Sequence, residues 1–178
     1  MKIINSKRCK EMIYEIKIYG EESLRAISTP VEEITDEIKD ILDGMVETMH
    51  DINGVGLAAS QVGINKRMFV IDVGDEIVRK VINPEIIELS DTIEDCEEGC
   101  LSIPGIYKNV KRSTHVKIKY TNVDGEEVIE SAEGLLARAF QHEYDHLDAI
   151  LFVDKVSPVA KRMISKKLQL LKKESVKK

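Results

Sequence analysis

Two histidines and a glutamate fall in one short stretch of the chain, residues 141–146, in the pattern His-Glu-x-x-His. Residues four apart on an α-helix lie on one face, so His142 and His146 can offer two imidazole nitrogens to one metal ion. Glu143 lies beside them without having to bind the ion, and can exchange a proton with water there. An amphipathic helix that buries two histidines for structural reasons would show the same spacing, so the stretch indicates a metal site without deciding for it.

A catalytic site of this kind needs a third protein ligand and one open position. Cys100 is the best candidate, because glycine and proline bracket residues 97–105 as a shaped loop. Cys96 is the rival, but the acidic residues around it raise the pKa of its thiol and disfavour a thiolate. His50 and His115 are poorly placed, since we expect one at the end of a helix and the other within a strand. A thiolate ligand would moderate the Lewis acidity of the ion.

A third stretch, Gly-Val-Gly-Leu-Ala-Ala-Ser-Gln at residues 54–61, has a backbone that could approach a ligand closely. It lacks the third glycine of a dinucleotide-binding turn and the Gly-Lys-Ser/Thr of a phosphate loop. On its own, this stretch favours a tight turn between a helix and a strand.

Hydrophobic periodicity predicts the helices that must carry these stretches. Thr35 is expected to cap a helix whose apolar residues recur as far as Met49, and the His-bearing helix is expected to begin at 132–134. Ser157-Pro158 predicts the start of a last amphipathic helix. The residues expected on its packing face are Val159, Met163, Ile164, Leu168 and Leu171.

Strands are predicted where β-branched and aromatic residues alternate with polar ones. Residues 68–73 and 77–82 should form a hairpin around Gly74-Asp75, with 85–89 continuing the sheet. A second hairpin is expected from residues 115–120 and 126–130. Two further segments, residues 12–19 and 151–153, are expected to be extended.

Composition describes one domain spanning residues 1–178, with 43% hydrophobic and 33% charged residues. No apolar run approaches the length of a membrane span, and no signal peptide is evident, while three cysteines without framework spacing favour a reducing compartment. We therefore expect a cytoplasmic protein without a membrane partner. Residues 1–15 read as an amino-terminal extension and 157–175 as a basic amphipathic helix.

The net charge of −6 conceals an asymmetry along the chain. From Lys161 onward there are eight Lys or Arg residues and one acid, a balance of +7, which leaves −13 for the remainder. A basic tail on an acidic body indicates contact with nucleic acid or another anionic surface. More often, however, a run of basic residues of this kind is simply the solvent-exposed face of a helix.

The three motifs together resemble the peptide deformylase family. The resemblance rests on G-V-G-L-A-A-S-Q (54–61), E-G-C-L-S (98–102) and Q-H-E-Y-D-H (141–146), which occur in the family's order, and it extends from about residue 16 to about residue 154. It implies hydrolysis of the formyl group from the initiator methionine of nascent chains. The implied fold is α+β, with mostly antiparallel sheets wrapped around the central His-Glu-x-x-His helix and a C-terminal helix.

The resemblance also implies a role for each motif residue. Cys100, His142 and His146 would hold one divalent metal, most simply Fe(II) in the cell, although Zn(II), Ni(II) or Co(II) could occupy the site. Glu143 would act first as general base and then as general acid. The residues implied to stabilise the oxyanion are Gln61 and the backbone N–H of Leu101. Those implied to align the peptide or to wall its methionine pocket are Val55, Gly56, Gly99, Leu135 and Ala139, and Asp145 would serve as an orienting or ion-pair partner.

Two positions depart from the family pattern. Glycine is common in the family where this chain has Ala149, and arginine is common where it has Tyr107, which could alter substrate contacts at the mouth of the pocket. Two alternatives to a deformylase remain: a zincin-like metalloprotease, and a metal-structured module that binds the ribosome or RNA. A combined form is a deformylase whose basic C-terminal helix contacts the ribosome.

Overall fold

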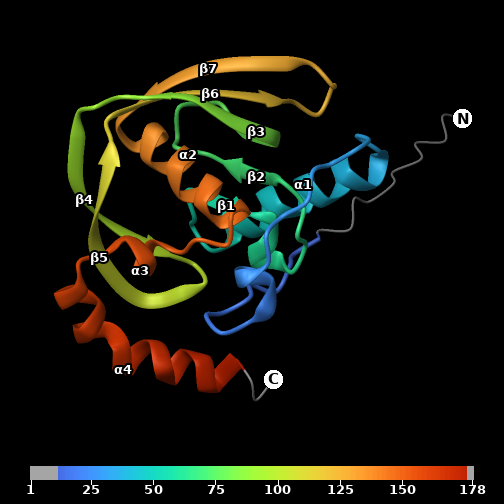
Figure 1. The fold of residues 1–178 in the computed structure, drawn as a ribbon. Helices are drawn as coiled ribbons and strands as arrows, with labels where there is room; N and C mark the ends of the chain where they lie inside the picture. Colours follow the sequence, from blue (N-terminus) through green and yellow to red (C-terminus); the bar gives the residue numbers. More distant parts are fainter. Residues whose placement is uncertain (1–11, 176–178) are drawn as a thin grey trace, which may run out of the picture.

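The His-bearing helix lies at the centre of the fold in the computed structural model, which describes residues 12–175 (Figure 1). Most of the predicted amino-terminal extension, with Cys9, therefore lies outside the described residues. The elements in chain order are η1 (Glu22–Arg25), α1 (Asp36–Asp51), β1 (Gly56–Ala58), η2 (Ala59–Val62), β2 (Met68–Ile71), β3 (Arg79–Leu89), β4 (Ile93–Cys100), β5 (Ile103–Ser113), β6 (His115–Thr121), β7 (Glu127–Glu133), α2 (Gly134–Leu147), α3 (Phe152–Lys155) and α4 (Pro158–Ser175).

Two antiparallel sheets surround α2. The larger has the strand order β1-β2-β3-β6-β7, and the smaller is a two-stranded ribbon of β4 and β5. Helix α2 contacts β1, β2, β6 and β7 of the larger sheet and β5 of the ribbon. The predicted α+β architecture, with antiparallel sheets around a central helix and a C-terminal helix, is confirmed.

The apolar side of α2 packs on the inner face of the larger sheet. Phe140 is fully buried, and its ring meets that of Phe69 edge-on with the two centroids 6.2 Å apart. The same cluster includes Ile71, Ile118 and Leu147. Aromatic pairs in this geometry add about 0.5 to 1.5 kcal/mol to the burial of apolar area. This packing fixes the position of α2 and therefore the direction of its opposite, polar side.

Helix α1 covers the end of the sheet that carries β1 and β2. Thr35 caps the helix as predicted, because its side-chain oxygen accepts a hydrogen bond from the N–H of Ile38. Met45 and Met49 on its buried side pack against Met68 and neighbouring residues of the sheet. The glycine-rich stretch after α1 thus begins from a fixed helix end.

The prediction of a loop at residues 97–105 is wrong, since these residues belong almost entirely to β4 and β5. Only Leu101 and Ser102 form the turn between the two strands. Strand β4 is solvent-exposed along most of its length, and its sequence is mainly acidic and polar. A strand in a two-stranded ribbon need not bury a face, so it lacks the alternation by which strands are found in a sequence.

Three smaller predictions also fail in part. The first hairpin exists, but Met68 pairs with Ile82 and Ile71 with Arg79, so residues 72–78 form a longer connection in place of a two-residue turn. Of residues 151–153, expected to be extended, only Leu151 is, whereas Phe152 and Val153 begin the single turn α3 (Phe152–Lys155). On α4 the packing face is formed by Ile164 and Leu168, with Leu171 partly buried against the same cluster as predicted, whereas Val159 and Met163 are 60% and 72% exposed.

The second hairpin, β6 and β7, agrees with its prediction, and its turn lies at residues 122–126. Residues 12–19 are extended without joining a sheet; the N–H of Lys17 donates to the carbonyl of Gln61, and that of Tyr19 to the carbonyl of Ser102. Among residues 12–175, no helix has both the length and the apolar character needed to span a bilayer.

Candidate active site

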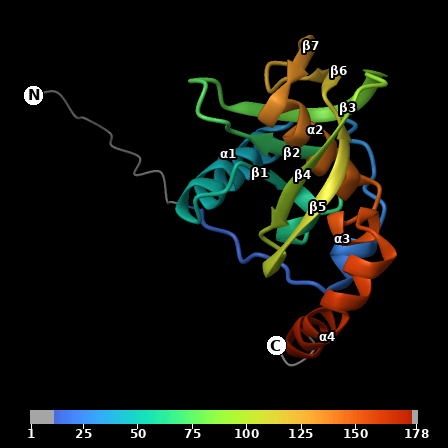
Figure 2. The same ribbon diagram turned by 90° about the vertical axis from the view of Figure 1, so that its left-hand side faces the viewer.

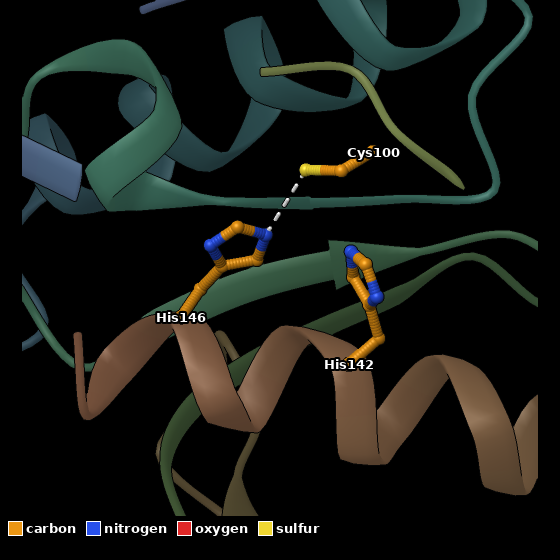
Figure 3. Close-up of side chains that lie close together, drawn as sticks. All are labelled: Cys100, His142 and His146. Carbon is orange, nitrogen blue, oxygen red and sulfur yellow. Dashed lines mark hydrogen bonds between the residues drawn. The ribbon is translucent and has the colours of Figure 1, made fainter. Parts of the chain in front are cut away.

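Three side chains from two distant parts of the chain converge at the polar side of α2. One potential ligand atom from each of Cys100, His142 and His146 lies within 4.8 Å of the others. Figure 3 shows both imidazole rings rising from α2 towards the cysteine, whose sulfur is 3.4 Å from Nε2 of His146. One thiolate and two imidazoles form a donor set that suits zinc and other late divalent metals, so the residues fit the ion that the motif implies.

The orientation of His142 is fixed by a carboxylate behind it. Its Nδ1 lies 3.0 Å from Oε2 of Glu98, on β4, and a proton between these two atoms leaves Nε2 free for a metal. Burial by itself raises the pKa of Glu98, but hydrogen bonds from Arg112 and His142 outweigh it and lower that pKa to about 2. Glu98 is therefore an anion whenever the protein is folded at neutral pH.

Arg112 on β5 joins this carboxylate to α2. Its Nε and Nη2 donate to the two oxygens of Glu98 at 2.7 and 2.9 Å, and its Nη1 donates to Asp145 at 2.5 Å. Asp145 also pairs with Lys155 of α3 at 2.9 Å. Both partners in the Arg112–Glu98 pair are only 4% exposed, so neither charge is solvated and each depends on the other. Asp145 thus has the ion-pair surroundings that its predicted role requires.

Glu143 is buried between α2 and β1. Burial raises its pKa to about 7, while positive charge at His142 opposes the increase. Its Oε2 has no hydrogen-bond partner among residues 12–175, although the carboxylate lines the cavity described below. A side chain on Gly56 would overlap this carboxylate, so the glycine is needed here for its small size. One buried carboxylate oxygen thus lacks a hydrogen-bond partner among the described residues, at the wall of the cavity.

Gln61 is oriented towards the same centre. Its Oε1 accepts the N–H of Ala58, which fixes the amide, and its Nε2 lies 3.4 Å from the sulfur of Cys100 and 3.1 Å from Oγ of Ser102. Leu101 follows Cys100 directly, in the turn between the two strands of the ribbon. Gln61 and Leu101, which come from different elements, both line the cavity beside the proposed metal ligands.

A cavity of about 450 Å³ opens beside Cys100 and His142. It is lined by all five residues expected to bind substrate, namely Val55, Gly56, Gly99, Leu135 and Ala139. Strand β1 stands at the end of the strand order of its sheet, and among residues 12–175 it pairs with β2 alone, so an extended peptide can be added along its other edge.

The structure keeps the rival metal ligands away from the three-residue group. Nε2 of His50 lies 2.8 Å from Asp72 and Nε2 of His115 lies 3.0 Å from Glu133, so each ring already has a carboxylate partner. Cys96 lies in β4 opposite Val110, and desolvation together with a hydrogen bond to Glu94 raises the pKa of its thiol.

Sequence reasoning missed Arg112, and it gave Glu98 no role. Glu98 belongs to the E-G-C-L-S motif, and its place there could have indicated a role at the site. Arg112 lies in no motif, and its role depends on the pairing of β4 with β5. Arg138 of α2 also lines the cavity.

A sheet-enclosed His-Glu-x-x-His helix, completed by a cysteine from a separate hairpin, defines the class of the protein as a metal-dependent hydrolase. Residues 13–162 match the model of the family described as polypeptide deformylase. The chain therefore belongs to the polypeptide deformylase family, an enzyme family that hydrolyses the formyl group from nascent chains with the help of a metal ion.

Individual relatives are similar over nearly their whole length. A peptide deformylase of Fusobacterium nucleatum subsp. nucleatum is 55% identical over 166 residues, which are 92% of this chain and 95% of the relative. The crystal structure of peptide deformylase from Thermotoga maritima superimposes with a TM-score of 0.80 at 47% identity, covering 82% of this chain and 99% of that one. The enzyme from Thermus thermophilus gives a TM-score of 0.87 at 36% identity, covering 92% of this chain and 99% of that one.

Proposed function

We propose that this chain hydrolyses N-formylmethionyl peptides at the centre formed by Cys100, His142 and His146, with formate and a free amine as products. The observation that carries the proposal is the convergence of one sulfur and two imidazoles beside a buried glutamate with an unpartnered oxygen. A divalent ion held by the three residues would polarise the formyl carbonyl and lower the pKa of water at its open position.

The surrounding residues then have complementary tasks. Glu143 takes a proton from the attacking water and returns it to the departing amine, which a carboxyl pKa of about 7 permits near neutral pH. The amide of Gln61 and the N–H of Leu101 donate to the oxyanion of the tetrahedral intermediate. Backbone groups at Val55 and Gly56 bind the peptide as an added strand, with Gly99 beside it, while Leu135 and Ala139 wall the methionine pocket.

The test compares formyl-Met-Ala-Ser with acetyl-Met-Ala-Ser in the wild type and in Glu143→Gln. We expect strong preference for the formyl peptide, and loss of turnover in Glu143→Gln with metal content and fold retained. Equal cleavage of the acetyl peptide, or of internal peptide bonds, would instead favour a zincin-like metalloprotease. A binding module without enzymatic activity would show no turnover in either protein.

We also propose Fe(II) as the metal in the cell, with Zn(II), Ni(II) or Co(II) able to replace it. A thiolate beside Fe(II) should make the enzyme sensitive to oxygen and peroxide. Activity should fall in air and return when iron is added under reducing conditions, and metal analysis after anaerobic purification should find iron. An enzyme indifferent to both treatments would point to zinc or nickel.

The exposed side of α4 supports a second proposal, that the enzyme acts in the cytoplasm in contact with ribosomal RNA. Lys166 and Lys167 are exposed on this helix together with Met163, next to an otherwise acidic body. The double substitution Lys166→Glu/Lys167→Glu should weaken salt-dependent co-sedimentation with ribosomes and leave turnover of short peptides unchanged. The control Lys111→Glu/Lys117→Glu makes the same charge change on the strands, and an equal loss there would refute a specific role for α4.

A further inference from the structure

Residues 14–19, which precede η1, run as an extended segment between two parts of the proposed active site. The backbone N–H of Lys17 donates to the carbonyl of Gln61 at 2.7 Å, and that of Tyr19 donates to the carbonyl of Ser102 at 2.8 Å. Figure 2 shows this segment, in dark blue, leading from α1 past the turn of the β4–β5 ribbon to η1. We call residues 14–19 the amino-terminal strap.

The two carbonyl groups belong to separate elements, and each element carries one proposed donor to the oxyanion. Gln61 lies in η2, and its side-chain amide is the first donor. Ser102 forms the turn of the ribbon together with Leu101, whose backbone N–H is the second donor. Residues two apart in an extended segment face the same way, so one short segment can reach both acceptors. The amino-terminal strap therefore connects the backbones that hold the two donors.

The amino-terminal strap is anchored by further contacts on both sides of the site. Tyr14 and Ile16 pack against the core cluster shared by α1, β1 and β2. The N–H of Tyr14 also donates to Oγ1 of Thr48 on α1 at 2.9 Å. At the other end, Tyr19 packs against the cluster that contains Ile103 of β5. The course of the strap is thus fixed by the core on one side and by the ribbon on the other.

The turn of the ribbon needs support from outside the ribbon. Among residues 12–175, β4 and β5 form a sheet with each other only, and a two-stranded ribbon is marginally stable by itself. One direct link comes from the amide of Gln61, whose Nε2 donates to Oγ of Ser102 at 3.1 Å. That amide has only two hydrogens, and one of them must reach the oxyanion, whereas the two hydrogen bonds of the strap use neither donor.

Donors to an oxyanion are effective only when their positions are fixed before the reaction. Removal of one such donor typically lowers kcat by about 10²- to 10³-fold, and a displacement of about 1 Å can cost about 10²-fold. The negative charge develops only in the transition state, so a misplaced donor should lower kcat and leave KM nearly unchanged. A segment that fixes both donors can therefore affect the rate without touching the substrate.

We propose that the backbone N–H groups of Lys17 and Tyr19 are positioning groups for catalysis, which set the separation between the Gln61 amide and the Leu101 N–H. This inference rests on the proposed deformylase function, and it assigns a task at that site to a segment outside the three motifs. It concerns the backbone of the strap, so substitutions that retain the N–H should be tolerated.

Lys17→Pro removes the first hydrogen bond, because proline has no N–H and its fixed φ suits an extended segment. We expect kcat for formyl-Met-Ala-Ser, per folded and metal-loaded molecule, to fall about 10-fold, with KM changed by less than about 2-fold. Metal content should remain at the wild-type level. Lys17→Ala is the matched control, since it removes the same side chain but keeps the N–H, and its kcat should remain close to that of the wild type.

A double-mutant cycle with Gln61→Ala separates positioning from general support of the fold. If the strap acts through the Gln61 amide, Lys17→Pro should lower kcat by only about 2-fold in the Gln61→Ala background, compared with about 10-fold in the wild type. An equal loss in both backgrounds, or a wild-type kcat in Lys17→Pro, would overturn the inference and leave the deformylase function intact.

Tyr19→Pro tests the second hydrogen bond independently. Tyr19→Ala is its control, because both variants lose the ring and only the proline loses the N–H. We expect the lower kcat in Tyr19→Pro, and the difference should persist in the Gln61→Ala background because the donor that it disturbs is Leu101. Failure of both proline variants to fold would show that the strap supports the fold as a whole, and would overturn a positioning role. Absence of turnover of formyl-Met-Ala-Ser by the wild type would instead overturn the proposed function, and the inference with it.

Discussion

Helices α2 and α4 are both amphipathic, but they differ in how deeply they are buried and in which side chains hold them in place. Figures 1 and 2 show α2 enclosed by strands, whereas α4 lies at the periphery beneath the β4–β5 ribbon. The buried residues of α2 include Gln141, Glu143, Asp145 and His146, whereas those of α4 are the apolar Ile164 and Leu168. Helix α2 is therefore held by specific polar partners from other elements in addition to its apolar packing on the sheet, and α4 by a narrow apolar contact alone.

The difference shows where sequence patterns carry structural information. On α2, the buried charge of Asp145 is tolerated because Arg112 of the ribbon, itself paired with Glu98, forms an ion pair with it. On α4, an apolar residue such as Met163 is covered by none of the described elements and remains exposed. A periodic apolar stripe predicts the helix, but the neighbouring elements decide which residues of the stripe are buried.

The largest effect is expected when the ionic support of α2 is removed by Arg112→Met. The carboxylates of Glu98 and Asp145 would remain buried without their cation, which should cost about 3 to 5 kcal/mol of unfolding free energy. Metal affinity should also fall by about 10- to 100-fold, because Glu98 would no longer be held against His142. Urea unfolding and competition with a chelator measure the two effects.

Arg112→Lys is the matched control for that substitution. It retains the charge but loses the planar fork that serves two carboxylates, so it should recover part of the stability and less of the metal affinity. Wild-type stability and metal affinity in Arg112→Met would show that the ionic network does not support α2.

The approach of β1 to α2 can be disturbed by Gly56→Ala. The added methyl group would displace the Glu143 carboxylate, and a misplacement of about 1 Å can lower kcat/KM by about 10²-fold. Metal content should remain, since the three atoms nearest to the new methyl group all belong to Glu143 and none to a proposed ligand. Unchanged turnover would mean that Glu143 can move aside and still act.

The apolar contact of α4 can be tested with Leu168→Ala. This residue is 6% exposed, and its truncation should cost about 2 kcal/mol, at the lower end of the range for buried leucine because the helix is peripheral. Met163→Ala on the exposed side is the control and should change stability by no more than about 0.5 kcal/mol. Equal losses in the two variants would contradict the assigned packing face.

The smallest effect is expected just beyond the end of α2, at Ala149→Gly. Ala149 has a φ of +59°, where a side chain costs about 1 to 2 kcal/mol and glycine is favoured. The substitution should raise unfolding free energy by about 1 kcal/mol, with kcat/KM unchanged. Thermal or urea unfolding measures the gain, and a loss of stability would mean that the alanine has packing that outweighs its backbone strain.

Much of this molecule could be predicted from local sequence, since Thr35, the second hairpin and the His-Glu-x-x-His helix each depend on neighbours along the chain. The spacing of that motif led to His142 and His146, and the glycine- and proline-bracketed stretch 97–105 led to Cys100. The ligand atoms of the three residues do converge. The family often has glycine at the position of Ala149, and the left-handed backbone conformation at this residue explains that preference locally.

The remainder depends on contacts between distant segments. Strand β4 is mostly exposed and acidic, and only its pairing with β5 makes it a strand. Arg112 lies in no recognisable motif, and its importance follows from the two carboxylates that fold against it. The change of register between β4 and β5 beyond Glu98 is likewise revealed by no periodicity in the sequence.

X-ray absorption at the zinc edge of the zinc-loaded protein tests the central assignment most directly. We expect one sulfur at about 2.3 Å and two imidazole nitrogens at about 2.0 to 2.1 Å, with the sulfur lost in Cys100→Ser. A first shell without sulfur in the wild type, or a sulfur that remains in Cys100→Ser, would contradict it.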